Sequence, residues 1–144
     1  MRKINYIVVH CSATREGCTL TSEALEAEHR RRGFRTTGYH YYIRRDGTVL
    51  GTRSLELPGA HCRGHNKYSI GICYEGGLDA QHRPADTRTP EQKASLLALL
   101  KELKARFPKA LVVGHHDLNP MKECPCFEAE REYKGDVKPL PRRF

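Results

Sequence analysis

The segment Gly114–Phe127 places two histidines, an aspartate, a lysine and two cysteines within little more than a dozen positions. It follows the apolar run 111–113 and contains two prolines, which exclude one continuous helix. We therefore expect a strand that ends in a rigid loop of reactive side chains. Histidine nitrogen and cysteine thiolate are the ligands that zinc prefers, and a catalytic zinc site needs three protein ligands and a fourth position for water. Two of those ligands could come from this loop.

A third ligand is available near the N-terminus, where the apolar run 6–9 ends in His10. Side chains alternate along a strand, so a His10 that faces a cleft leaves Cys11 facing the core as a packing thiol. His10 and His115 would both stand at the carboxyl ends of their strands. If those strands are near neighbours, this is the edge at which open α/β sheets place their sites.

The bulk composition favours one globular domain. A chain of 144 residues buries roughly 68% of its unfolded surface and needs no disulfides for a core. No apolar run approaches the roughly 20 residues of a membrane span, and residues 1–6 lack the features of a secretory signal. We therefore expect residues 1–144 to form a single domain that is cytoplasmic as synthesised, with no membrane insertion and with a peripheral tail at 134–144.

The cysteines and the charge restrict the chemistry further. Without a signal peptide, a reducing compartment favours free thiols or metal ligands over disulfides for the six cysteines. The net charge of +8 would steer the protein toward a polyanion such as nucleic acid, an anionic cell wall or an acidic membrane surface. A solvated basic surface without a dedicated partner is the plain alternative.

The remaining sequence predicts an α/β fold, in which a mixed central sheet is flanked by helices and the site lies at the carboxyl ends of the strands. Apolar runs and an Asp-Gly turn predict strands at 3–9, 38–43, 48–50, 69–74 and 110–113. A helix over 23–32 would be capped by Thr21 or Ser22, and a second, from Pro90 to Phe107, would begin with a Thr89–Gln92 capping box.

Three further predictions concern side-chain placement. A period of two in the strand 38–43 puts Tyr39, Tyr41 and Ile43 on one face of the sheet. His29, in the first helix, is expected at the surface. The polar segment 79–88 is expected to be a surface loop.

Five motifs, in this order along the chain, resemble the type 2 N-acetylmuramoyl-L-alanine amidases. They are Val8–Thr14, Gly38–Tyr41, Arg45–Val49, Asn66–Ile72, and Gly114–Asp117 together with Lys122–Pro125. The similarity covers about residues 4–133 and is strongest to small phage endolysins and prophage amidases of that family, to which the peptidoglycan recognition proteins also belong. It implies a zinc hydrolase that cuts the amide between N-acetylmuramic acid and the first L-alanine of the peptidoglycan stem.

The resemblance also implies roles for individual residues. His10, His115 and Cys124 match the zinc ligands, Tyr39 and Lys122 match the catalytic tyrosine and lysine, and His61 matches a histidine of the substrate cleft. Zinc lowers the pKa of bound water to about 7, and a fixed lysine charge stabilises a negatively charged tetrahedral intermediate. The tyrosine hydroxyl can orient the water or relay its proton. Asp117 could hold a ligand imidazole or cap the local turn.

This sequence departs from the family pattern in two ways. His115 and Cys124 are one residue further apart than in the shortest phage members, and His116 restores the shorter spacing, which makes it the rival second ligand. We prefer His115 because it directly follows the glycine that ends the strand. Cys126 is a competing thiolate, but Pro125 in a short turn disfavours both cysteines binding one metal, so a packing role is expected.

Two other functions compete with an enzyme that acts on peptidoglycan as a monomer. Family members that bind peptidoglycan without cutting it typically lack the third-ligand cysteine, whereas Cys124 is present here. A nucleic-acid binder with a structural zinc would suit the positive charge, but the sequence has no paired Cys-x-x-Cys clusters and no helix-turn-helix signature. We therefore expect no specific nucleic-acid partner, and an enzyme that meets the wall after release or export.

Overall fold

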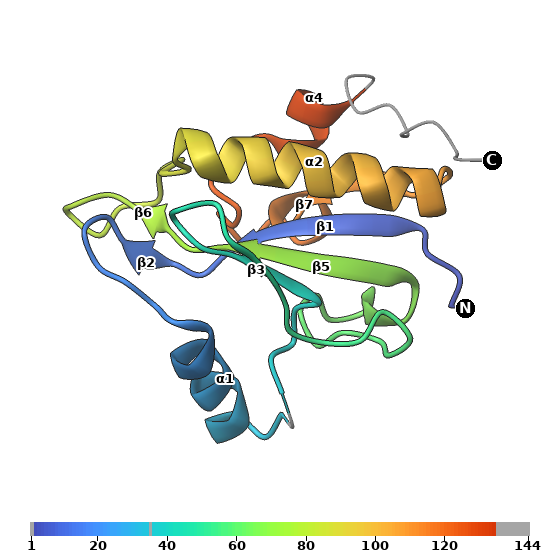
Figure 1. The fold of residues 1–144 in the computed structure, drawn as a ribbon, viewed down its shortest axis with the longest axis horizontal. Coiled ribbons are helices and arrows are strands. Elements are labelled where there is room, and N and C mark those ends of the chain that lie inside the picture. The colour runs from blue at the N-terminus through green and yellow to red at the C-terminus, as the bar shows by residue number, and fades with distance from the viewer. Residues whose placement is uncertain (1, 35, 135–144) are drawn as a thin grey trace.

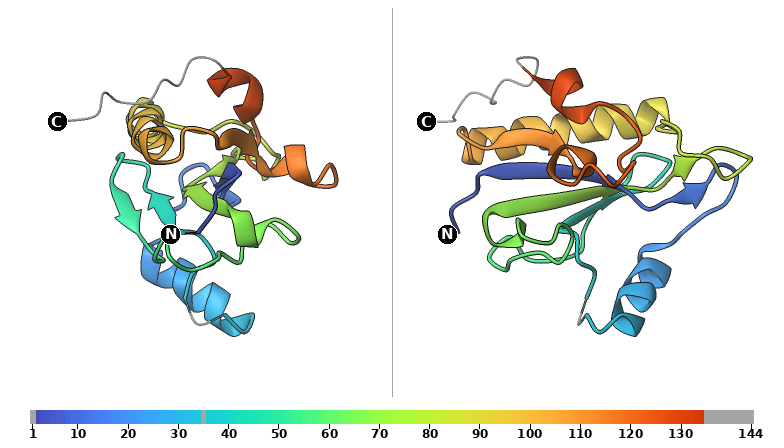
Figure 2. Two further views of the ribbon diagram at one scale, coloured as in Figure 1. Left: turned by 90° about the vertical axis from the view of Figure 1, so that its right-hand side faces the viewer. Right: turned by 180° about the vertical axis from the view of Figure 1, so that it is seen from behind.

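A computed structural model describes residues 2–34 and 36–134, in which helices lie on both faces of a central sheet (Figures 1 and 2). The strands are β1 (Tyr6–Cys11), β2 (Thr14–Arg15), β3 (Tyr41–Ile43), β4 (Val49–Gly51), β5 (Ser69–Tyr74), β6 (Gly77–Leu78) and β7 (Leu111–Gly114). The helices are α1 (Ser22–Arg31), α2 (Pro90–Arg106), α3 (His115–Leu118), α4 (Ala129–Tyr133) and the 3₁₀ turn η1 (Asn66–Tyr68). The predicted tail, except for Lys134, lies outside the described residues.

The five-stranded sheet has the order β4-β3-β5-β1-β7, and β2 pairs with β6 in a separate ribbon. Strand β1 runs parallel to β5 on one side and to β7 on the other, while β4 is antiparallel to β3. Because Val9 lies opposite Gly114 in the β1–β7 pair, His10 and His115 follow at the same edge of the sheet. The predicted mixed sheet is confirmed, and the two strands that carry these histidines are neighbours, which was the condition for a shared site at this edge.

The two faces of the sheet are covered by different helices. Alternate residues of β1, such as Ile7 and Val9, pack in a core cluster with Leu96, Leu100 and Leu103 of α2. The opposite face packs against α1, whose Leu25 contacts a smaller cluster around Tyr42 and Cys73. Figure 1 shows α2 and α1 on opposite sides of the sheet. Cys11 belongs to the cluster beneath α2, so the predicted alternation of His10 and Cys11 is confirmed.

The predicted helix caps are also confirmed. The Thr21 hydroxyl accepts a hydrogen bond of 3.1 Å from the backbone N–H of Ala24. Thr89 and Gln92 form the reciprocal capping box, with bonds of 3.1 and 3.0 Å. After β7 the chain makes the single helical turn α3 and leaves it before Pro120, which cannot continue a helix. None of the described helices combines the length and the apolarity that crossing a membrane requires.

Two predicted side-chain placements are wrong. Strand β3 begins only at Tyr41, so the period of two does not extend back to Tyr39, which packs on the α1 side while Tyr41 and Ile43 pack on the α2 side. His29 is only 5% exposed, and its Nδ1 atom accepts a 2.7 Å hydrogen bond from the backbone N–H of Gly38. The signal for its burial was its position four residues after Leu25, on the same face of α1.

Candidate functional site

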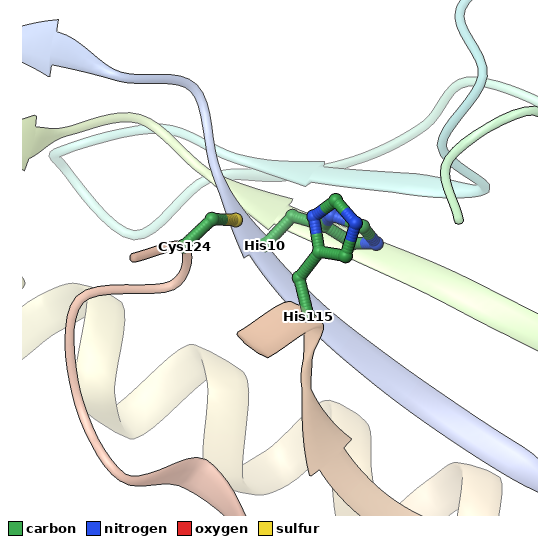
Figure 3. Close-up of side chains that lie close together, drawn as sticks. All are labelled: His10, His115 and Cys124. Atoms are coloured by element: carbon green, nitrogen blue, oxygen red, sulfur yellow. The ribbon is translucent and has the colours of Figure 1, made fainter. Parts of the chain in front are cut away.

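Three potential metal ligands meet at the carboxyl ends of β1 and β7. His10 is the next-to-last residue of β1, His115 opens α3 directly after β7, and Cys124 comes from the loop that follows α3. One ligand atom from each residue lies within 4.8 Å of the others. Figure 3 shows the two rings and the sulfur gathered at this edge of the sheet. These residues could together hold one metal ion.

The surroundings of His10 keep it in the form that binds metals. Its side chain is buried, at 1% exposure, between the rings of His61 and His115. Burial, and then the proximity of those two histidines, lowers the pKa of His10 well below its ordinary value. The ring is therefore neutral at pH 7 and has a lone pair available for a metal.

The loop between His115 and Cys126 is held in place by hydrogen bonds. The backbone N–H of Gly114 donates to Oδ2 of Asp117 at 2.7 Å, so Asp117 caps the local turn, one of its two predicted roles. The Tyr74 hydroxyl donates to the carbonyl oxygen of Pro125 at 2.6 Å. These bonds connect the loop to β7 and β5, and they fix where Cys124 lies relative to the sheet.

His116 and Cys126 face away from the three potential ligands. The His116 Nε2 atom lies 3.4 Å from carboxylate oxygens of Asp117 and Glu128, on the outer side of α3. The Sγ atom of Cys126 packs 3.9 Å from that of Cys11, which places both thiols against the core. A hydrogen bond with Cys124, the largest influence, raises the pKa of the Cys11 thiol to about 12. The structure thus groups His115, and not His116, with His10.

Of the predicted catalytic side chains, one lies beside these ligands and one does not. The ring of Tyr39 is centred 5.0 Å from that of His10, and burial raises its pKa well above the ordinary value, so its hydroxyl keeps its proton at pH 7. Lys122 is exposed in the turn two residues before Cys124. Within residues 2–34 and 36–134, its ammonium group takes part in no hydrogen bond or ion pair that would tie it to the other site residues.

His61 touches the site through His10, with its Nδ1 atom 2.8 Å from Nε2 of His10. The loop that carries it is tied to β5 by His40, whose role was not predicted. His40 is fully buried; its Nδ1 accepts from the N–H of Gly71 at 3.0 Å, and its Nε2 lies 2.8 Å from the carbonyl oxygen of Leu57. Burial lowers the pKa of His40 to about 4, so it stays neutral. The position of His40 in the Gly-Tyr-His motif was the sequence feature that could have indicated this role.

Arg88 is a second supporting residue that the sequence did not reveal, because the segment 79–88 was expected to be a surface loop. Its guanidinium group pairs with Asp86 at 2.9 Å and with Glu132 of α4 at 2.8 Å. It also lies 3.4 Å from the ring centre of Phe127, just beyond the loop that carries Cys124. Apart from Asp86, its partners lie on α4 and on the loop after Cys126, and no local pattern near position 88 indicates them.

The comparisons with known proteins identify the family to which the sequence is similar. Residues 1–127 match the family described as N-acetylmuramoyl-L-alanine amidase. The endolysin of Enterobacteria phage K11 is 40% identical over 126 residues, which cover 88% of this chain and 83% of the endolysin. The solved N-acetylmuramoyl-L-alanine amidase LysC from Clostridium intestinale is 30% identical, with a TM-score of 0.79 and coverage of 95% of this chain and 88% of LysC.

A more distant structure shares the fold. Drosophila peptidoglycan recognition protein SA is 20% identical, with a TM-score of 0.75 and coverage of 100% of this chain and 85% of its own. The family match spans residues 1–127 and agrees with the family resemblance of the five motifs. This chain belongs to the N-acetylmuramoyl-L-alanine amidase family.

Proposed function

We propose that this amidase works with a zinc ion held by His10, His115 and Cys124. The observation that carries the proposal is the convergence of these three side chains, whose ligand atoms lie within 4.8 Å of one another. Two imidazoles and a thiolate suit zinc, whereas magnesium and calcium prefer oxygen ligands. Three protein ligands are also the number found in catalytic zinc sites, which keep one position open.

When bound, zinc would activate water by lowering its pKa to about 7 and would polarise the carbonyl of the scissile amide. We assign to Tyr39 the role of a hydrogen-bond donor beside the zinc ion. Because burial raises the pKa of this tyrosine, its hydroxyl remains a hydrogen-bond donor at neutral pH. It would orient the attacking water and stabilise the negative charge that develops on the amide oxygen.

Lys122 would contribute a positive charge to the same transition state. It is exposed in the turn two residues before Cys124, and its long, flexible side chain would have to extend toward the ligands to act there. A lysine charge near the amide oxygen lowers the barrier because the negative charge on that oxygen is greater in the transition state than in the substrate. We do not extend this role to His116, which faces Asp117 and Glu128.

The bond proposed to be cut is the amide between N-acetylmuramic acid and L-alanine in peptidoglycan. The endolysin relatives support an enzyme that is made in the cytoplasm and meets the wall after release or export. We propose further that residues 1–144 act as one domain and as a monomer. The charge of +8 suits the carboxylates of the stem peptides and anionic wall polymers.

The decisive experiment measures release of soluble peptide from purified peptidoglycan by the wild-type protein, with and without a chelator and with zinc added back. Mass spectrometry of the products identifies the new termini. We expect free L-alanine amino ends on unbroken glycan, lost with the chelator and restored by zinc. Binding to intact wall without release under any metal condition would instead support a peptidoglycan-recognition module.

A further inference from the structure

The side chain of His61 makes its closest polar contact with His10. The Nδ1 atom of His61 lies 2.8 Å from Nε2 of His10, and the two rings are nearly perpendicular, at 88°. On its other side, Nε2 of His61 lies 3.2 Å from the hydroxyl of Ser69, a buried residue of β5. Both ring nitrogens of His61 therefore have partners within the protein.

This chain of contacts determines which nitrogen of His10 is available to a metal. A neutral imidazole has one N–H donor and one lone pair, and the lone pair is what a metal binds. Since Nε2 of His10 faces His61, Nδ1 is the nitrogen left for a ligand. Nε2 then carries the hydrogen and donates it to Nδ1 of His61, whose own Nε2–H donates to the hydroxyl of Ser69.

The ring of His61 is held firmly enough to impose this choice. A Cβ atom on Gly71 would lie 2.6 Å from Cγ of His61, and one on Gly59 would lie 2.4 Å from Cδ2. The ring therefore packs directly against the backbone of two glycines, where any side chain would clash with it. The backbone N–H of His61 donates to the Asn66 side chain at 2.9 Å. The position of the ring is thus determined by the fold, and it does not depend on a bound substrate.

We propose that His61 is a positioning residue for the metal centre: it selects the tautomer of His10 and so raises metal affinity. The inference rests on the proposed zinc function and replaces the expected role of His61 as a substrate-cleft residue. An outer partner that orients a ligating histidine typically contributes about 10–100-fold to metal affinity. The effect on substrate binding should be small by comparison.

The test compares His61→Phe, which keeps the ring shape without nitrogens, with His61→Asn, whose side-chain oxygen can accept the bond from His10. Zinc affinity of the full chain is measured by competition with a chromophoric chelator. The absorption spectrum of the cobalt-substituted protein reports the ligand geometry. We expect His61→Phe to weaken zinc binding by about 10–100-fold and to alter the cobalt spectrum, and His61→Asn to recover most of both. Saturating zinc should leave KM for a soluble muropeptide near the wild-type value.

Ser69→Ala provides a second test that leaves His61 in place, and a smaller loss of zinc affinity in the same direction is expected. Circular dichroism of the metal-free proteins checks that each variant folds. Wild-type zinc affinity in both His61→Phe and Ser69→Ala, with a raised KM in the former, would overturn the proposal and return His61 to the substrate cleft. A wild-type protein that binds no zinc would instead refute the proposed zinc function, and the wild-type titration alone reveals that outcome.

Discussion

The backbone N–H of Cys11 donates a hydrogen bond of 3.1 Å to the Sγ atom of Cys124, although the two residues are 113 positions apart. Because Cys11 directly follows His10 in β1, this bond places the sulfur beside the histidine. The end of β1 therefore helps to position two of the three potential ligands.

The assignment of the second ligand is tested by comparing His115→Ala with His116→Ala. Because His115 is grouped with His10 and Cys124, its loss should reduce peptidoglycan hydrolysis by more than about 100-fold, the upper range for losing only an outer partner of a ligand. His116→Ala should keep most of the activity and its zinc. Zinc content and peptide release are measured on both proteins, and the opposite ranking would make His116 the ligand.

Tyr39→Phe should slow the reaction without removing the metal. The substitution keeps the ring beside His10 and deletes the hydroxyl, so we expect kcat to fall by about 10²–10⁴-fold, the usual contribution of proton transfer or donation by a positioned side chain. Zinc content should not change. Tyr41→Phe, on the other face of the sheet, is the matched control, and a similar loss of kcat in both variants would argue for a general structural effect.

Lys122→Met should lower kcat through the loss of a positive charge near the reacting amide. A reduction of about 10²–10³-fold is expected, comparable to the loss of one oxyanion donor. Lys109→Met, an exposed lysine in the turn before β7, removes the same charge elsewhere and should leave the rate unchanged. Equal rates for the wild type and Lys122→Met would exclude a catalytic role for this lysine.

Arg88→Met should destabilise the fold through the loss of a buried guanidinium. The side chain is 1% exposed, but its partners Asp86 and Glu132 are 31% and 43% exposed and can regain water. We therefore expect a loss of about 2 kcal/mol, below the roughly 3–5 kcal/mol typical of a broken, fully buried pair. The free energy of unfolding is measured by urea titration, with circular dichroism as the signal. Arg83→Met, which breaks the exposed pair with Asp79, should cost less than about 0.5 kcal/mol.

The buried carboxylate of Glu75 predicts a loss of stability in acid. Burial alone would raise its pKa, but hydrogen bonds from the Arg44 side chain at 2.8 Å and from the backbone N–H of Leu20 at 2.7 Å outweigh burial and hold the pKa below 4.5. A carboxyl with a lowered pKa in the folded state stabilises the protein above its unfolded pKa, and this contribution disappears as the pH falls through the folded pKa.

Glu75→Gln isolates this effect. At pH 7 the variant should be less stable by about 2 kcal/mol, the contribution of hydrogen bonds to a charged group. The difference from the wild type should shrink as the pH falls below about 4.5, because only the wild type then takes up the extra proton. Urea unfolding between pH 7 and 3 measures both free energies. A difference that is constant with pH would contradict a lowered pKa.

The sequence by itself determined the features that arise from local patterns. Apolar runs marked β1, β5 and β7, and the Thr89–Gln92 pair marked the start of α2, because strand burial and helix capping depend on residues close together in the chain. The same local patterns placed His10 and His115 at the ends of strands. Because β1 and β7 are neighbours in the sheet, the two histidines lie at the same edge.

Only the tertiary structure decided which way the side chains point at that edge. His115 and His116 are consecutive in α3, where each residue turns about 100° from the last, so one joins His10 while the other faces Glu128. The late start of β3 reversed the face of Tyr39, and the contact of His61 with His10 joins segments 51 residues apart. Such directions depend on where a strand ends and on which distant segment packs against it, and neither is encoded in a local pattern.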